Sequence, residues 1–229
     1  MNNSFLAKFL VVSLAVVSLL FPVVAFCADR EAETAEHPVR VAVIPFQIVL
    51  PQAEAGNTAI CPLCGAVYFS GKIAEGADKV VENLFIEKLQ GIKGIEIISR
   101  ERVEGIYRRI RTEALKTPLV DILKKVRAES GADLIAVGFI FRYTERIGYN
   151  YSAEKPASVA FEINLFNHKD SSAFWRGVFD KTQKSLMENL LEIASFYKGG
   201  GKWLTARELA KQGMDQVFST LPELEHDKY

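Results

Sequence analysis

The feature that sets the fold is a nearly continuous apolar run, VRVAVIPFQI at residues 39–48. Its β-branched side chains predict a strand buried on both faces, because a strand with one solvent-exposed face would alternate apolar and polar residues. A strand of this kind needs other elements packed against the sheet, and helices supply them in α/β proteins. We therefore expect a sheet covered by helices.

Helical and strand patterns alternate along the rest of the chain. We expect helices over residues 72–90, 100–110 and 119–130, and strands over residues 95–99, 132–145, 157–168 and 173–183. Two more helices should begin at the capping boxes Ser185–Glu188 and Thr205–Glu208, separated by KGGGKW. The pattern predicts an α/β fold with a single mixed sheet of about four to five strands, covered by helices, and a two-helix C-terminal segment.

Alternation within residues 157–168 also assigns the faces of that strand. Glu162 and Asn164 alternate with apolar residues, so we expect Glu162 on an exposed face, where replacing it would do little. The predicted core contains Val41, Val43, Phe46, Leu84, Ile97, Leu134, Phe161 and Ile163.

The amino terminus predicts export. Lys8 precedes an uninterrupted apolar run at residues 9–21, which Pro22 ends and small residues around Ala25 follow. This order is typical of a cleaved secretory signal, and the run falls short of the roughly 20 apolar residues of a spanning helix. An uncleaved anchor is the alternative.

Cys27 adds a second alternative, because lipoprotein signals also end at a cysteine. The residue before it should then be small, and here it is Phe26. Plain export is the favoured interpretation, with lipidation of Cys27 and peripheral membrane association kept open. The predicted divisions are a signal peptide at 1–25, a charged tether at 26–38, an α/β envelope domain at 39–222 and a flexible tail at 223–229.

Charge and histidine content exclude several functions. The chain has 28 basic and 28 acidic residues, so no basic excess is available to neutralise nucleic-acid phosphates. The three histidines, His37, His168 and His226, lie in the tether, a turn and the tail. None is expected at a pocket, which argues against a histidine-based catalytic site. No cofactor is expected, since no glycine-rich phosphate loop follows the first strand.

The two cysteines of the motif CPLCG, residues 61–65, could form a disulfide, a zinc site or a redox-active pair. In an oxidising compartment a close pair most often forms a disulfide, so we expect a Cys61–Cys64 bridge. A structural zinc site needs four ligands, and the pair supplies two, so zinc would need a dimer or a distant histidine. Redox enzymes place such a pair at a helix start, and here Gly65 and AVYFSGK delay the helix.

The order of four segments resembles a known family. VAVIPF, GIEIISRERVEGI, ESGADLIAVGFI and FWRGVFDKTQKSLMENL follow one another between about Val39 and Leu221. Together they resemble the exported bacterial lipoproteins that include the curli secretion component and the penicillin-binding-protein activator, and the amino-terminal domain of TolB. The resemblance implies a central strand at GADLIAVGFI and a closing strand at the W…FD segment. Phe26 and the modest hairpin connection at 142–156 depart from it, so pore formation is not implied.

We therefore expect a non-enzymatic exported envelope protein, in the periplasm or on the periplasmic face of the outer membrane. Its α/β domain would bind another envelope protein in assembly, secretion or peptidoglycan synthesis, with a homo-oligomer as a further option. The candidate binding residues are the loop tyrosines Tyr143, Tyr149 and Tyr151, because aromatic loop tips are common binding anchors, and Trp203, for which core packing is the plainer interpretation. The alternative function is an exported thiol-disulfide oxidoreductase that uses Cys61 and Cys64.

Overall fold

The apolar run at the start of the domain forms an inner strand of the sheet that is covered on both faces, as the sequence predicts. The computed structural model describes residues 37–51, 56–114, 116–150, 152–167, 173–184 and 202–224, all within one unit that spans Glu36–Tyr229. Strand β1 (Val39–Val43) pairs in parallel with β5 (Ile95–Ile97) on one side and with β6 (Leu134–Thr144) on the other. Strands β9 (Ser158–Phe166) and β10 (Trp175–Thr182) continue the sheet antiparallel beyond β6.

The strand order is therefore β10-β9-β6-β1-β5, and a short strand β2 (Gln47–Ile48) also pairs with β6. The expected single strand at 39–48 is divided in two at Pro45, which has no N–H to donate to a neighbouring strand. The prediction of an α/β fold with one mixed main sheet is confirmed.

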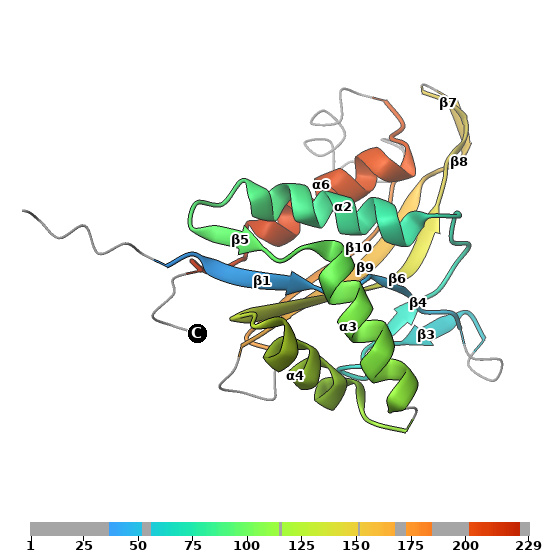
Figure 1. The fold of residues 1–229 in the computed structure, drawn as a ribbon. Coiled ribbons are helices and arrows are strands. Elements are labelled where there is room, and N and C mark those ends of the chain that lie inside the picture. The colour runs from blue at the N-terminus through green and yellow to red at the C-terminus, as the bar shows by residue number, and fades with distance from the viewer. Residues whose placement is uncertain are drawn as a thin grey trace, which may run out of the picture. The chain divides into compact units, whose positions relative to one another are not determined.

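Both faces of the sheet are covered (Figure 1). Helices α2 (Ala77–Gln90) and α6 (Ala206–Phe218) pack on one face. Helices α3 (Arg100–Glu113) and α4 (Leu119–Ser130) pack on the other, beside a hairpin of β3 (Thr58–Ile60) and β4 (Val67–Phe69). Of the two predicted C-terminal helices, α6 is present with its Thr205–Glu208 capping box, and the other lies outside the described residues.

Helix α2 begins five residues later than the periodicity predicts. Ile73 forms a bridge with Tyr143 of β6, and Gly76 has a φ of 74° at the N-cap. A left-handed residue cannot belong to a right-handed helix, so the helix begins at Ala77.

The predicted core residues lie together. Seven of them are buried, and the eighth, Ile97, is half-buried and packs against the same cluster, between the sheet and helices α2 and α6. A second cluster fills the space between the opposite face and α3, α4 and β3–β4. Within the described ranges, no helix has both the length and the apolar character needed to cross a bilayer.

The segment at 142–156 also forms the modest hairpin that the sequence predicts. Its strands are β7 (Ile147–Tyr149) and β8 (Ser152–Lys155), which pair antiparallel and project from one end of the domain (Figure 1).

Candidate functional site: two thiols and a buried carboxylate

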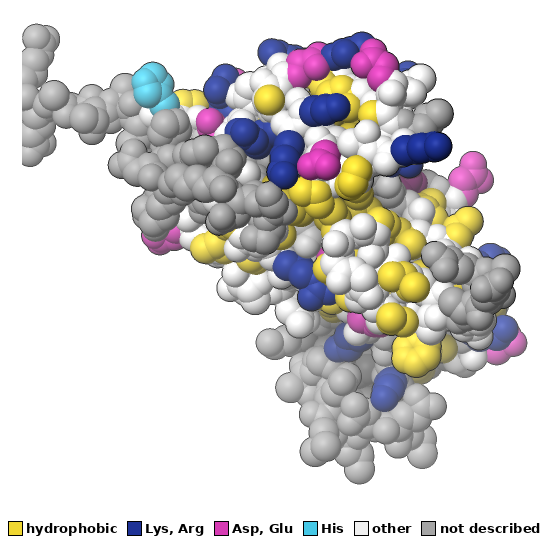
Figure 2. All heavy atoms as spheres, turned by 90° about the horizontal axis from the view of Figure 1, so that it is seen from below, with side chains coloured by type: hydrophobic (Ala, Val, Ile, Leu, Met, Phe, Trp, Pro, Cys, Tyr) yellow, Lys and Arg dark blue, Asp and Glu magenta, His cyan; other side chains and the backbone are white. Residues whose placement is uncertain are grey.

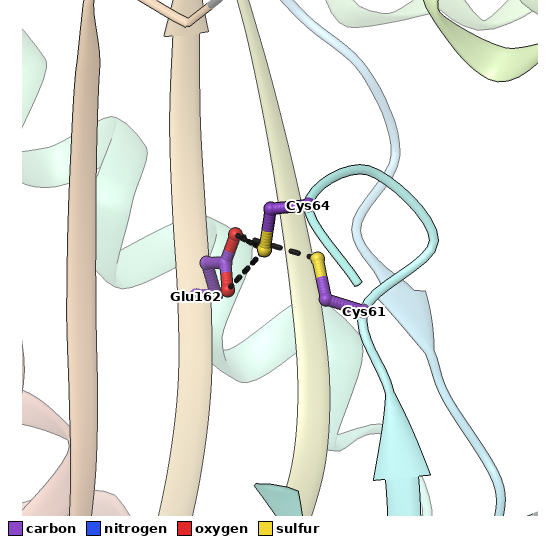
Figure 3. Close-up of side chains that lie close together, drawn as sticks. All are labelled: Cys61, Cys64 and Glu162. Carbon is purple, nitrogen blue, oxygen red and sulfur yellow. Dashed lines mark hydrogen bonds between the residues drawn. The ribbon is translucent and has the colours of Figure 1, made fainter. Parts of the chain in front are cut away.

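The CPLCG motif forms the tip of the β3–β4 hairpin, where the sequence predicted only a loop. The amide of Cys61 donates to the Ala66 carbonyl at 2.8 Å, and the Gly65 amide donates to the Cys61 carbonyl at 3.0 Å. Gly65 has a φ of 71°, a conformation that glycine adopts without steric cost. The turn thus holds both cysteine side chains on the same side, directed at the sheet (Figure 3).

Both thiols meet the carboxylate of Glu162 from β9 (Figure 3). The sulfur atoms of Cys61 and Cys64 each lie 3.4 Å from Oε1 of Glu162, and Cys64 also lies 3.6 Å from Oε2. Both cysteines are free thiols, with Cys61 buried and Cys64 exposed. The predicted disulfide is therefore not formed in this structure, and it stays a prediction for the oxidised protein.

Glu162 is the main correction to the sequence analysis. It was expected on an exposed face, yet its exposure is 0%. The predicted alternation is present, because Phe161 and Ile163 face α2 and α6 while Glu162 faces the other way. The β3–β4 hairpin covers that second face, and Tyr68 of β4 packs there, stacked 3.9 Å from the ring of Phe141.

Three further side chains hold the buried carboxylate. Arg176 on the neighbouring strand β10 donates to Oε2 at 2.9 Å, and the Tyr68 hydroxyl donates to the same oxygen. Asn164 donates to Oε1 at 2.9 Å. Arg176 also donates to the Tyr68 hydroxyl at 2.8 Å, so the network is closed.

These contacts decide which groups carry charge. Burial alone would raise the pKa of Glu162, but the hydrogen bonds from Arg176, Tyr68 and Asn164 outweigh it and hold the pKa at about 2. Burial, helped by the hydrogen bond to Glu162, raises the pKa of Tyr68. The site at neutral pH therefore contains an ionised carboxylate beside a neutral phenol.

Cys61 lacks the lowered pKa that is typical of a reactive thiol. Burial raises its pKa to about 12, although backbone hydrogen bonds from Cys64 and Leu63 act in the other direction. A nucleophilic cysteine needs a lowered pKa, which a helix N-terminus or a nearby cation provides. Here the motif lies at a hairpin turn and the nearest charge is negative, which disfavours the oxidoreductase interpretation.

The other predicted binding residues have different surroundings. Tyr143 is only 5% exposed and belongs to the core, so it offers almost no surface to a partner. Tyr149 is 83% exposed on β7, and the half-buried Trp203 donates its amide to the carbonyl of neighbouring Asn150 at 2.7 Å. The fold thus brings Trp203 to the β7–β8 hairpin. Tyr151, Cys27, His168 and His226 lie outside the described residues.

The β3–β4 hairpin also has an apolar outer face that the sequence did not predict. Ala59 and Tyr68 form the inward cross-strand pair, so Ile60, Val67 and Phe69 point away from the sheet. Val67 is 65% and Phe69 is 73% exposed. The alternation in TAI and VYF carried this signal, but the segments are too short to be recognised as strands.

Comparison with known proteins gives weak similarities. The sequence matches no protein-family model, and no curated protein matches it. Among solved structures, the PelC dodecamer from Paraburkholderia phytofirmans is 11% identical, with 80% of this chain and 86% of that chain covered and a TM-score of 0.43. A lipoprotein from Neisseria meningitidis is 12% identical, with 72% and 99% covered and a TM-score of 0.38. The LpoB C-terminal domain from Escherichia coli is 9% identical, with 64% and 85% covered and a TM-score of 0.35.

Similarity at this level assigns neither a family nor a function. The resemblance to envelope lipoproteins therefore stays a prediction from the order of the sequence segments.

Proposed function

We propose that the chain is a non-enzymatic exported protein of the cell envelope, whose α/β domain binds another envelope protein through the outer face of the β3–β4 hairpin. The observation that carries this proposal is the pair of strongly exposed apolar side chains Val67 and Phe69, with Ile60 beside them. Large apolar side chains grouped on one surface are typical of protein–protein contact sites.

The surroundings of these residues support a contact surface. Ile48 and Leu50, which precede the hairpin in the chain, are also exposed. Figure 2 shows hydrophobic side chains gathered on the side of the molecule that carries β3 and β4. An aromatic residue on a fixed strand loses little conformational entropy on binding, so Phe69 is the expected anchor.

Hydrogen bonds tie the hairpin to the sheet at both ends. At its tip, the two thiols contact Glu162. At its open end, Arg142 donates to the Phe69 carbonyl at 2.7 Å and to the Ser158 hydroxyl at 2.6 Å, and pairs with Asp180. A preorganised surface of this kind favours recognition, since less ordering is needed when the partner arrives.

The same site offers little for catalysis. Its buried thiol has a raised pKa, and its carboxylate accepts hydrogen bonds from Asn164 on the same strand and from Arg176 on strand β10. This chemistry supports a structural role for the cluster within a binding domain, in an exported protein whose amino-terminal run directs it to the envelope.

Crosslinking and affinity capture from whole envelopes test the proposal. The wild-type protein should capture a specific envelope protein, and Phe69→Ser should reduce the yield about tenfold or more, as for an interface hot spot. Tyr149→Ser, on the other exposed hairpin, is the matched variant and should leave capture unchanged.

Two results would contradict the proposed surface. Equal capture by wild type and Phe69→Ser would remove β3–β4 as the contact, and a loss in Tyr149→Ser alone would move it to the β7–β8 hairpin and Trp203. Recovery of the chain crosslinked only to copies of itself would show a homo-oligomer in place of a different envelope protein.

A further inference from the structure

We propose that Cys61, Cys64 and Glu162 form a site for a single zinc ion within one chain. This inference goes beyond the proposed function and does not depend on it. Three ligand atoms, the two sulfurs and a carboxylate oxygen, lie within 4.8 Å of one another. The sequence supplied only two of these ligands, and the fold adds the third from a strand about 100 positions further along, as the 101-residue separation of Cys61 and Glu162 shows.

The spacing fits tetrahedral zinc. Bonds of about 2.3 Å to sulfur and about 2.0 Å to a carboxylate oxygen, at the tetrahedral angle, hold sulfur and oxygen about 3.5 Å apart. The observed separation is 3.4 Å from Oε1 of Glu162 to each sulfur. The two sulfur-to-oxygen separations therefore already match those of a zinc site.

The two carboxylate oxygens of Glu162 make different contacts. Oε2 accepts hydrogen bonds from Arg176 and Tyr68, which fix the orientation of the group. Oε1 accepts a hydrogen bond from Asn164 and faces both sulfurs, whose thiols donate to it at 3.4 Å in the absence of metal. Metal-binding carboxylates and histidines are commonly oriented by outer hydrogen bonds of this kind.

Charge also balances in a zinc-bound cluster. Zinc binding would release the two thiol protons to solvent. Two thiolates and one carboxylate then balance the charges of the zinc ion and of Arg176, so the buried cluster is neutral overall.

Zinc is the metal that this set of ligands favours. Thiolate ligands select against magnesium and calcium, which take oxygen ligands, and an iron–sulfur cluster takes four cysteines or a mixture with histidine. Three protein ligands leave one tetrahedral position, which a water molecule would fill on the exposed side, where Cys64 lies.

The test is metal analysis of the full chain, purified under reducing conditions, with cobalt(II) as a spectroscopic substitute. We expect one zinc per chain and, with cobalt, a thiolate charge-transfer band together with the strong ligand-field bands of tetrahedral coordination. Cys27→Ser, which removes the cysteine outside the site, should bind the same amount. The Cys61→Ser, Cys64→Ser double variant should lose the metal, and Glu162→Gln should weaken binding about 10- to 100-fold.

Circular dichroism of each variant separates loss of the site from loss of the fold. Absence of zinc and of the cobalt bands in the folded, reduced protein would overturn the proposal, as would unchanged affinity in Glu162→Gln. One zinc per two chains would replace it with a site shared across a dimer. None of these readouts requires the envelope partner, so failure of the metal site and failure of the proposed function are distinguishable.

Discussion

At the scale of single residues, Glu162 is where sequence and structure disagree most. An acidic residue that alternates with apolar ones on a strand is normally solvent-facing, and nothing near Glu162 in the sequence indicates the hairpin that covers it. The covering segment lies 94 residues earlier at Tyr68, in a stretch that looks like a loop. Long-range coverage of this kind cannot be read from local periodicity.

The first prediction therefore reverses the expectation from the sequence. Glu162→Ala should lower the free energy of unfolding by about 3 kcal/mol, because it leaves Arg176, Tyr68 and Asn164 without their acceptor inside the protein. Urea unfolding of the metal-free protein measures this. Glu154→Ala, at an exposed position on β8, is the control and should stay within about 0.5 kcal/mol. An equally small effect at Glu162 would contradict the buried network.

The adjacent residue on β9 gives a second prediction. Ile163 is fully buried against α2 and α6, on the face that the sequence assigned correctly. Ile163→Ala should cost about 2–5 kcal/mol by the same measurement, since it removes apolar contacts and leaves a cavity. Ile163→Val should cost about 0.5–1.5 kcal/mol, and a larger loss for valine than for alanine would mean that strain rather than a cavity dominates.

At the scale of elements, helix α6 begins at a capping box that contains a titratable residue, Glu208. The Glu208 side chain accepts hydrogen bonds from the Thr205 backbone and hydroxyl and pairs with Lys202 at 2.9 Å. The Thr205 backbone bond is the largest influence, and together these contacts lower the pKa of Glu208 to about 2. Because the folded pKa lies below the unfolded value, the stabilisation is present at neutral pH and is lost as the pH falls toward 2.

The matching measurement compares melting temperatures of the wild type and Glu208→Ala. The variant should be less stable by about 1 kcal/mol at pH 7, the usual contribution of a helix cap, and the difference should shrink between about pH 5 and pH 2. Glu87→Ala, at an exposed position on α2, should melt like the wild type at pH 7. If the difference in melting temperature between the wild type and Glu208→Ala increased as the pH fell, that result would contradict the lowered pKa of Glu208.

The open end of the β3–β4 hairpin depends on Arg142. Arg142→Met keeps the aliphatic stem and removes the hydrogen bonds to Phe69 and Ser158 and the pair with Asp180. We expect faster amide exchange and earlier proteolytic cleavage within residues 56–71, while the helices stay protected. Arg108→Met, which removes an exposed ion pair on α3, should change neither. Uniform loss of protection would show that Arg142 supports the whole sheet rather than the hairpin.

At the scale of the whole molecule, much of the architecture was predictable because the strong signals are local and long. The buried β1, the amphipathic α3 and α4 and the alternating β9 each carry their own pattern over many residues. The short strands β3 and β4 were missed for the opposite reason. Strands of three residues, such as β3 and β4, hold too few positions to show a period, and the site is built on them.

Export is the prediction that concerns the chain as a whole. The mature amino terminus should lie between Phe26 and Asp29, because Pro22 and Ala25 end the apolar run there. Amino-terminal sequencing of the protein from envelope fractions checks it, and an intact Met1 would contradict cleavage. A diacylglyceryl group on Cys27, seen by mass spectrometry, would identify the lipoprotein route instead.

The separation in sequence between the hairpin tip and Glu162 also sets the order in which these residues would emerge from the membrane during export. The two sulfurs precede the carboxylate by 101 and 98 residues, so an exported chain that crosses the membrane from its amino end presents the cysteines first. Until β9 follows and pairs with β6, nothing shields the thiols from the oxidants of an oxidising compartment. In an exported chain, slow translocation would favour a Cys61–Cys64 bridge and rapid translocation the carboxylate-bound pair, so the ratio of the two forms would depend on the rate of translocation.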